Sequence, residues 1–121
     1  MGKQKRNPFG DAFRGILATY RSERNLRIHA ALALVAVILG IWLDVTREDW
    51  CWIVLCIALV VMTELFNTAL EAWVDLISPN YHPLAGKAKD AAAAAVLVAA
   101  AFAAIIGGII FVPKVWTTLI G

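Results

Sequence analysis

Three carboxylates and an amide interrupt a long apolar stretch in the segment TELFNTALEAWVD, residues 63–75. Glu64, Asn67, Glu71 and Asp75 recur at helical spacing, so on an α-helix they share one face, which we call the polar stripe. Such side chains can abstract a proton, bind a metal ion through oxygen or line a polar path. An ionisable group inside a membrane span is costly unless it pairs, meets water or serves a function. The polar stripe is therefore the first candidate site.

Glu64 is the member of the polar stripe that is hardest to explain as a surface charge. It lies about 16 Å deeper along the helix than Asp75, which could simply sit at the membrane surface. Glu64 and Glu71 are roughly 10 Å apart along the axis, so one straight helix cannot bring both to a single metal ion. A magnesium site at Glu71 needs another oxygen donor, and Glu23 is the obvious supplier. Within RSERN, Glu23 fits a solvated charge equally well.

The composition places these residues in an integral membrane protein. Of 121 residues, 61% are hydrophobic and 17% are charged, which excludes an ordinary soluble domain. Three apolar stretches approach or exceed the roughly 20 residues that cross a bilayer. We predict an all-α fold in a single domain over residues 1–121. Its expected parts are a flexible tail over 1–8, an amphipathic surface helix over 9–25 and transmembrane helices over 26–43, 50–77 and 91–112.

The distribution of lysine and arginine predicts the orientation in the membrane. Seven of the eleven basic residues lie before the first span or, as Arg27 does, at its very start, and Lys87 and Lys89 lie between the second and third spans. The positive-inside rule therefore places the N-terminus and residues 78–90 in the cytoplasm. No basic stripe is interleaved with aromatic residues, so we expect no nucleic-acid binding.

The remaining segments connect and pack the spans. Prolines and a glycine predict a loop over 78–90, before a third span whose helix begins near Asp90. That span is crowded with alanine and glycine, which favours close packing against other helices. Cys51 and Cys56 are five residues apart on one predicted helix, so we expect neither a disulfide nor a metal site there.

Three segments resemble the prokaryotic diacylglycerol kinase family of small integral-membrane lipid kinases: ERNLRIH at 23–29, ELFNTALEAWVD at 64–75 and YHPLAGKAKD at 81–90. The resemblance extends from about Phe9 to Lys114. ERNLRIH, YHPLA and the closing IIFVPK are most similar to the undecaprenol kinase branch of this family. A diacylglycerol acceptor, phosphorylated by the same chemistry, stays open as the alternative.

The resemblance implies a role for each member of the candidate site. Glu64 would be the general base that takes the proton of the lipid hydroxyl, and Asn67 would help to orient the reacting groups. Glu23 and Glu71 would hold Mg²⁺ on the phosphates of ATP, the phosphoryl donor.

The remaining carried-over roles concern the nucleotide. Lys89 and Asp90 would contact it, His82 would border it, and Asp75 would have a supporting role.

The resemblance also implies an assembly and a location. The family is trimeric, with active sites built between subunits, so the chain would form a homotrimer in the cytoplasmic (inner) membrane of a bacterium with its active site on the cytoplasmic side. The sequence departs from the family pattern at Phe66, where a smaller aliphatic residue is usual. It departs again at Asn80, where the diacylglycerol branch carries an acid that touches the nucleotide.

An ion or proton pathway is the alternative from another functional class, because a polar stripe can line a channel. Residues 53–62 are almost wholly apolar, however, and a route across the membrane would need that half of the helix to be wet. Phosphoryl transfer requires mainly positioning and neutralised phosphate charge. The phosphate loops GxxxxGK[ST] and GxGxxG do not occur, so a kinase built this way is of a separate kind.

Overall fold

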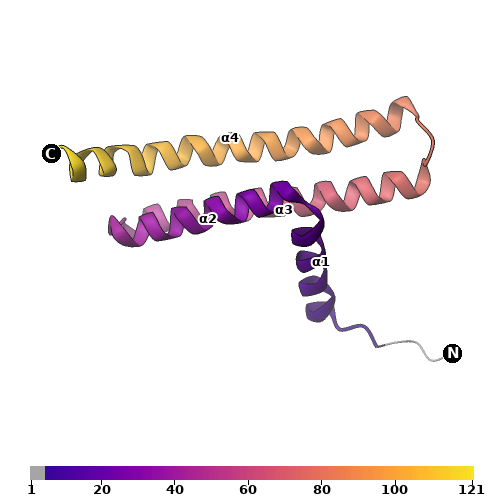
Figure 1. Ribbon diagram of the computed structural model, residues 1–121, viewed down its shortest axis with the longest axis horizontal. Coiled ribbons are helices and arrows are strands. Elements are labelled where there is room, and N and C mark those ends of the chain that lie inside the picture. The colour runs from indigo at the N-terminus through magenta and orange to yellow at the C-terminus, as the bar shows by residue number, and fades with distance from the viewer. Residues whose placement is uncertain (1–4) are drawn as a thin grey trace.

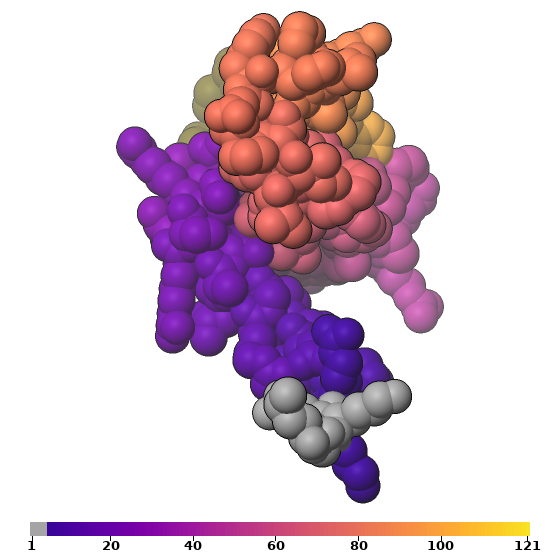
Figure 2. Space-filling view, turned by 90° about the vertical axis from the view of Figure 1, so that its right-hand side faces the viewer, coloured from indigo at the N-terminus to yellow at the C-terminus, as the bar shows by residue number. Residues whose placement is uncertain are grey.

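The computed structural model describes residues 5–121, which form four helices joined by short connections (Figure 1). Residues 1–4 of the predicted flexible tail lie outside this range. Helices α2, α3 and α4 run alongside one another, and each is long and apolar enough to cross a membrane. Helix α1 projects away from this bundle, as the end-on view also shows (Figure 2). The predicted arrangement of an N-terminal helix and three spans is thus confirmed.

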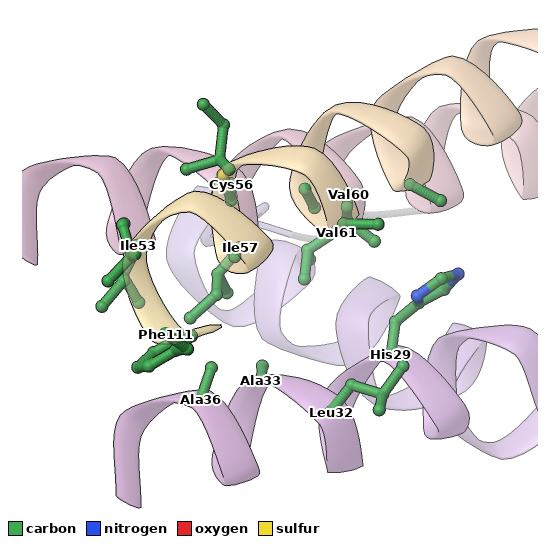
Figure 3. Close-up of a pocket in the computed structure, with 16 residues that line it drawn as sticks. His29, Leu32, Ala33, Ala36, Ile53, Cys56, Ile57, Val60, Val61 and Phe111 are labelled. Atoms are coloured by element: carbon green, nitrogen blue, oxygen red, sulfur yellow. The ribbon is translucent and has the colours of Figure 1, made fainter. Parts of the chain in front are cut away.

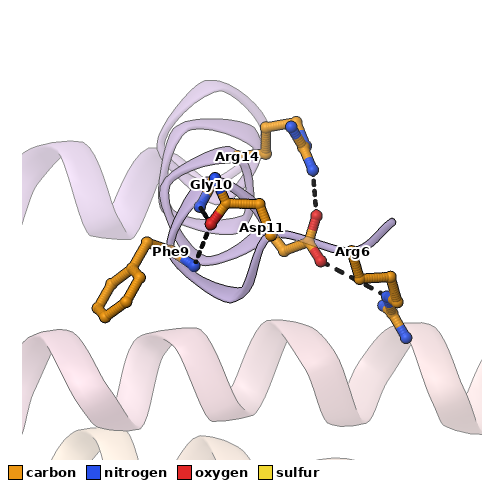
Figure 4. Close-up of polar contacts among 6 residues, drawn as sticks. Arg6, Phe9, Gly10, Asp11 and Arg14 are labelled. Atoms are coloured by element: carbon orange, nitrogen blue, oxygen red, sulfur yellow. Dashed lines mark hydrogen bonds and ion pairs between the residues drawn. The ribbon is translucent and has the colours of Figure 1, made fainter. Parts of the chain in front are cut away.

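Helix α1 (Pro8–Ser22) is fixed at its start by polar contacts. The Asn7 side chain accepts hydrogen bonds from the first free N–H groups of the helix, at 3.2 and 3.3 Å. Asp11 in the first turn pairs with Arg6 and Arg14 (Figure 4). Large apolar side chains remain exposed along the helix: Phe9, Phe13, Ile16, Leu17 and Tyr20. This arrangement is typical of a helix that lies on a membrane surface.

A single extended residue, Glu23, separates α1 from α2 (Arg24–Trp42). Its φ of −110° and ψ of 110° interrupt the helical path, so α1 ends before residue 25, where we predicted its end. The Arg27 guanidinium donates hydrogen bonds to the carbonyls of Tyr20 and Arg21, at 2.9 Å each. These bonds satisfy carbonyl groups that the end of α1 would otherwise leave unpaired.

Helix α3 (Arg47–Ile77) begins with a capping box. The Thr46 side chain accepts from the Asp49 N–H at 3.1 Å, and the Asp49 carboxylate accepts from the Thr46 N–H at 3.3 Å. The Asp49 carboxylate also lies 3.5 Å from Nζ of Lys114. This ion pair joins the start of α3 to the C-terminal part of the last helix. Side chains of the turn itself, of α3 and of α4 therefore hold the α2–α3 turn in place.

Helix α4 (Pro83–Leu119) begins earlier than predicted, so the loop is limited to residues 78–82. His82 caps the helix, because its Nδ1 accepts from the Leu84 N–H at 3.1 Å. Proline at the first position has no N–H to lose and a φ suited to a helix. The helix also continues through Pro113, past the predicted limit of residue 112.

Close packing is concentrated near the α2–α3 turn. Val45, Ile53 and Ile110 are buried there as one cluster. A Cβ added to Gly40 would lie 2.6 Å from Cη2 of Trp50, so α2 and α3 approach through a position that only glycine fits. Most other large apolar side chains of the bundle are exposed, as expected for surfaces that face lipid or other membrane helices.

Candidate active site

Glu64 is the most deeply buried carboxyl group in the described chain, with 2% of the residue exposed. It lies on α3 in the half of the helix nearest to α1 and the 78–82 loop, which we call the α1 end of the bundle. Its Oε1 atom is 3.3 Å from Nε2 of His29 on α2. The two groups are not aligned as donor and acceptor, and Oε1 has no hydrogen bond within the chain.

Two further polar atoms beside Glu64 are buried without a hydrogen-bond partner among residues 5–121. They are Oδ1 of Asn67 and Oγ1 of Thr68. Buried polar atoms in native proteins are nearly always paired, because an unpaired one costs its full desolvation penalty. Three such atoms in adjacent turns therefore leave unused hydrogen-bonding capacity on the face of α3 that the chain itself covers.

The structure brings the two predicted magnesium ligands to the neighbourhood of Glu64. Glu23 lies at the break between α1 and α2 and Glu71 lies on α3, and both are half-buried. Both carboxylates lie close enough to Glu64 for their charges to act on it. Residues 5–121 contain no group of three or more side chains that could hold a metal ion by themselves. The metal ligands that the described chain offers here are thus two carboxylates, those of Glu23 and Glu71.

The residues predicted to contact a nucleotide lie further along the α1 end. Nζ of Lys89 forms an ion pair with Oδ1 of Asp75 at 2.5 Å, which links α4 to α3. Asp90 is exposed on α4, within the helix rather than at its start. His82 is occupied as the cap of α4. The structure therefore gives Asp75 a partner that sequence reasoning did not assign.

Sequence reasoning missed His29 as a site residue. The sequence signal was an ionisable side chain at the start of a membrane span, within the segment ERNLRIH. Its contact with Glu64 depends on two helices meeting, which no local pattern reveals.

An apolar groove of about 370 Å³ starts beside His29 and runs between α2, α3 and α4 (Figure 3). His29 lies at one end, and Ala36, Ile53 and Phe111 lie toward the other. The side chains between them are small or aliphatic, including Ala33, Ile57, Val60 and Ala103. The groove can accept a hydrocarbon chain but offers no polar path across the bundle.

Comparison with known proteins identifies similar sequences over most of the chain. The family profile described as "Prokaryotic diacylglycerol kinase" matches residues 10–111. Undecaprenol kinase of Bacillus subtilis (strain 168) is 48% identical over 106 residues, which cover 88% of this chain and 86% of that protein. Diacylglycerol kinase of Escherichia coli (strain K12) is 38% identical over 90 residues, covering 74% of each chain.

Proposed function

We propose that this chain, which belongs to the prokaryotic diacylglycerol kinase family, uses ATP to phosphorylate the hydroxyl of undecaprenol. Its family and its named relatives identify the chain as a lipid-alcohol phosphotransferase. The observation that carries this proposal is the buried Glu64 carboxylate at the His29 end of an apolar groove.

In the proposed reaction, Glu64 takes the proton of the acceptor hydroxyl. The hydroxyl oxygen then forms a bond to the γ-phosphorus of ATP, and the bond from that phosphorus to the β,γ-bridging oxygen breaks, releasing ADP. Asn67 lies one turn from Glu64, and its buried amide oxygen has no partner within the chain. The amide of Asn67 can therefore orient the hydroxyl by donating an N–H to its oxygen, while Glu64 accepts the hydroxyl's single proton.

Glu23 and Glu71 fit a magnesium ion that arrives with ATP. Mg²⁺ is usually held by one or two carboxylates together with phosphate oxygens and water, so a pair of acidic side chains is an adequate donor set. When bound, the ion neutralises phosphate charge.

We place the nucleotide at the α1 end, near the 78–82 loop. Lys89 offers a cationic group to the phosphates, and its pairing with Asp75 holds the side chain on the α3 side of α4. Asp90 follows it on α4 and His82 borders the loop. The exposure of this region suits a donor that comes from water.

The assembly that we propose is a homotrimer in the bacterial cytoplasmic membrane, with the α1 end in the cytoplasm. The large apolar side chains that remain exposed along the bundle give it surfaces that can pack against other copies of the chain. The excess of basic residues before the first span supports the orientation.

Diacylglycerol is the second candidate acceptor. The Escherichia coli relative carries that name, and its identity to this chain is 38% against 48% for the undecaprenol kinase. The higher identity and wider coverage favour undecaprenol.

Phosphate transfer from labelled MgATP to each lipid, offered separately to purified protein, tests the proposal. Glu64→Gln should lower kcat by about 10²–10⁴-fold, the usual contribution of a general base. Glu48→Gln is the matched control, because it makes the same change to an exposed residue at the opposite end of α3. Faster transfer to diacylglycerol would overturn the acceptor, and full activity of Glu64→Gln would overturn the mechanism.

A further inference from the structure

We propose that His29 is a positioning residue, which holds Glu64 by Oε1 so that Oε2 faces the acceptor hydroxyl. This inference rests on the proposed function, in which Glu64 is the general base.

The geometry singles out His29 as the group that can fix the carboxylate. Its Nε2 lies 3.3 Å from Oε1 of Glu64. Glu23 and Glu71, which also lie near Glu64, are acidic and cannot donate to it when ionised. Within the described chain, no ion pair or hydrogen bond engages Oε2. One carboxylate oxygen therefore has a neighbour that can donate, and the other is left for a substrate.

Burial makes this contact consequential. The side chain of Glu64 is 3% exposed and that of His29 is 21% exposed, so little water is present to orient the carboxylate instead. The pair is at hydrogen-bond distance but not yet aligned, as is common for catalytic hydrogen bonds before substrate binds.

The position of His29 also relates the contact to the apolar groove. The imidazole lines the end of the groove nearest to Glu64 (Figure 3). His29 is thus the residue of the groove lining that contacts Glu64. Two roles are therefore distinguishable: positioning the base, which affects kcat, and lining the acceptor's path, which affects the KM for the lipid.

Two amide substitutions separate these roles. In His29→Gln, the side-chain nitrogen can reach the place of Nε2, so a donor to Oε1 is retained. In His29→Asn, the amide nitrogen reaches only as far as Nδ1, so that donor is lost although the side chain stays polar. We expect His29→Asn to lower kcat by about 10- to 100-fold, as misplacement of a catalytic group does. His29→Gln should restore kcat to within about 5-fold of the wild type, and the KM values for lipid and ATP should change little in either variant.

The controls distinguish failure of this inference from failure of the proposed function. Val35→Ala on the exposed face of α2, outside the groove, should leave kcat unchanged. In a Glu64→Gln background, His29→Asn should cause no further loss, because residues that act as a unit are not additive. Activity of Glu64→Gln equal to wild type overturns the proposed function. A low kcat for Glu64→Gln together with equal kcat values for the two His29 variants, or an effect confined to the lipid KM, overturns the positioning role alone.

Discussion

Replacing Gly40 by alanine should destabilise the bundle, and the structure sets the size of the effect. The added Cβ would lie 2.6 Å from Cη2 and 3.0 Å from Cζ2 of Trp50. Non-bonded carbon atoms rest at about 3.5–4.0 Å, so the indole ring must shift by roughly 1 Å. Overpacking costs about 1–3 kcal/mol, and alanine gains up to about 1 kcal/mol in helix propensity over glycine. We therefore expect the free energy of unfolding to fall by about 1 kcal/mol, within a range of roughly 0–3 kcal/mol.

The effect of Gly40→Ala should disappear when the indole is shortened. Phenylalanine at position 50 lacks the outer ring atoms that obstruct the added Cβ. In a Trp50→Phe background, Gly40→Ala should leave the free energy of unfolding unchanged or raise it by up to about 1 kcal/mol.

Reversible unfolding in mixed micelles, with an increasing fraction of denaturing detergent, measures all four members of this cycle. Gly108→Ala is the matched control, since a Cβ there meets nothing within 4 Å in the chain. The same loss from Gly40→Ala in both backgrounds, or a gain in the wild type, would refute the steric explanation.

Two further predictions concern the ends of the helices. Thr46→Ala removes the acceptor of the capping box and should lower the free energy of unfolding by about 1 kcal/mol, whereas Thr46→Ser should be nearly silent in the same unfolding assay. Lys89→Ala should raise the KM for MgATP by about 10- to 100-fold, the equivalent of one charge-assisted hydrogen bond. Because the Lys89–Asp75 pair is largely exposed, Asp75→Asn should change stability by less than about 1 kcal/mol, and an unfolding loss as large as that of a core mutation would contradict this assignment.

The helices were predictable because their signals are local. Apolar runs of sufficient length indicated the three spans, and apolar periodicity indicated the helix before them. The predicted start of α4, near Asp90, was wrong, although the sequence contains the signals for a start at Pro83. Pro83 and Gly86 suggested a loop, yet proline suits the first position of a helix and His82 provides the cap.

The candidate site was predictable in its polar stripe but not in its partners. Glu64 stood out because a carboxyl group deep in an apolar run needs a reason. The contact between His29 and Glu64, and that between Lys89 and Asp75, join residues on different helices. Such contacts depend on how the helices are rotated and spaced, which hydropathy and spacing along one helix do not specify.

The three spans differ in length, so the shortest one is the most sensitive to bilayer thickness. Helix α2 has 19 residues and is about 29 Å long, close to the roughly 30 Å of a typical hydrocarbon core. Helices α3 and α4 have 31 and 37 residues, about 46 and 55 Å, so they tilt in a typical bilayer and can span a thicker one by tilting less. As the bilayer thickens, its hydrocarbon core therefore exceeds the length of α2 before that of the other helices. Helix α2 begins directly after the extended Glu23. We therefore expect the chain length of the surrounding lipids to affect the position of Glu23 relative to Glu71. The activity of the enzyme should then depend on the thickness of the host membrane.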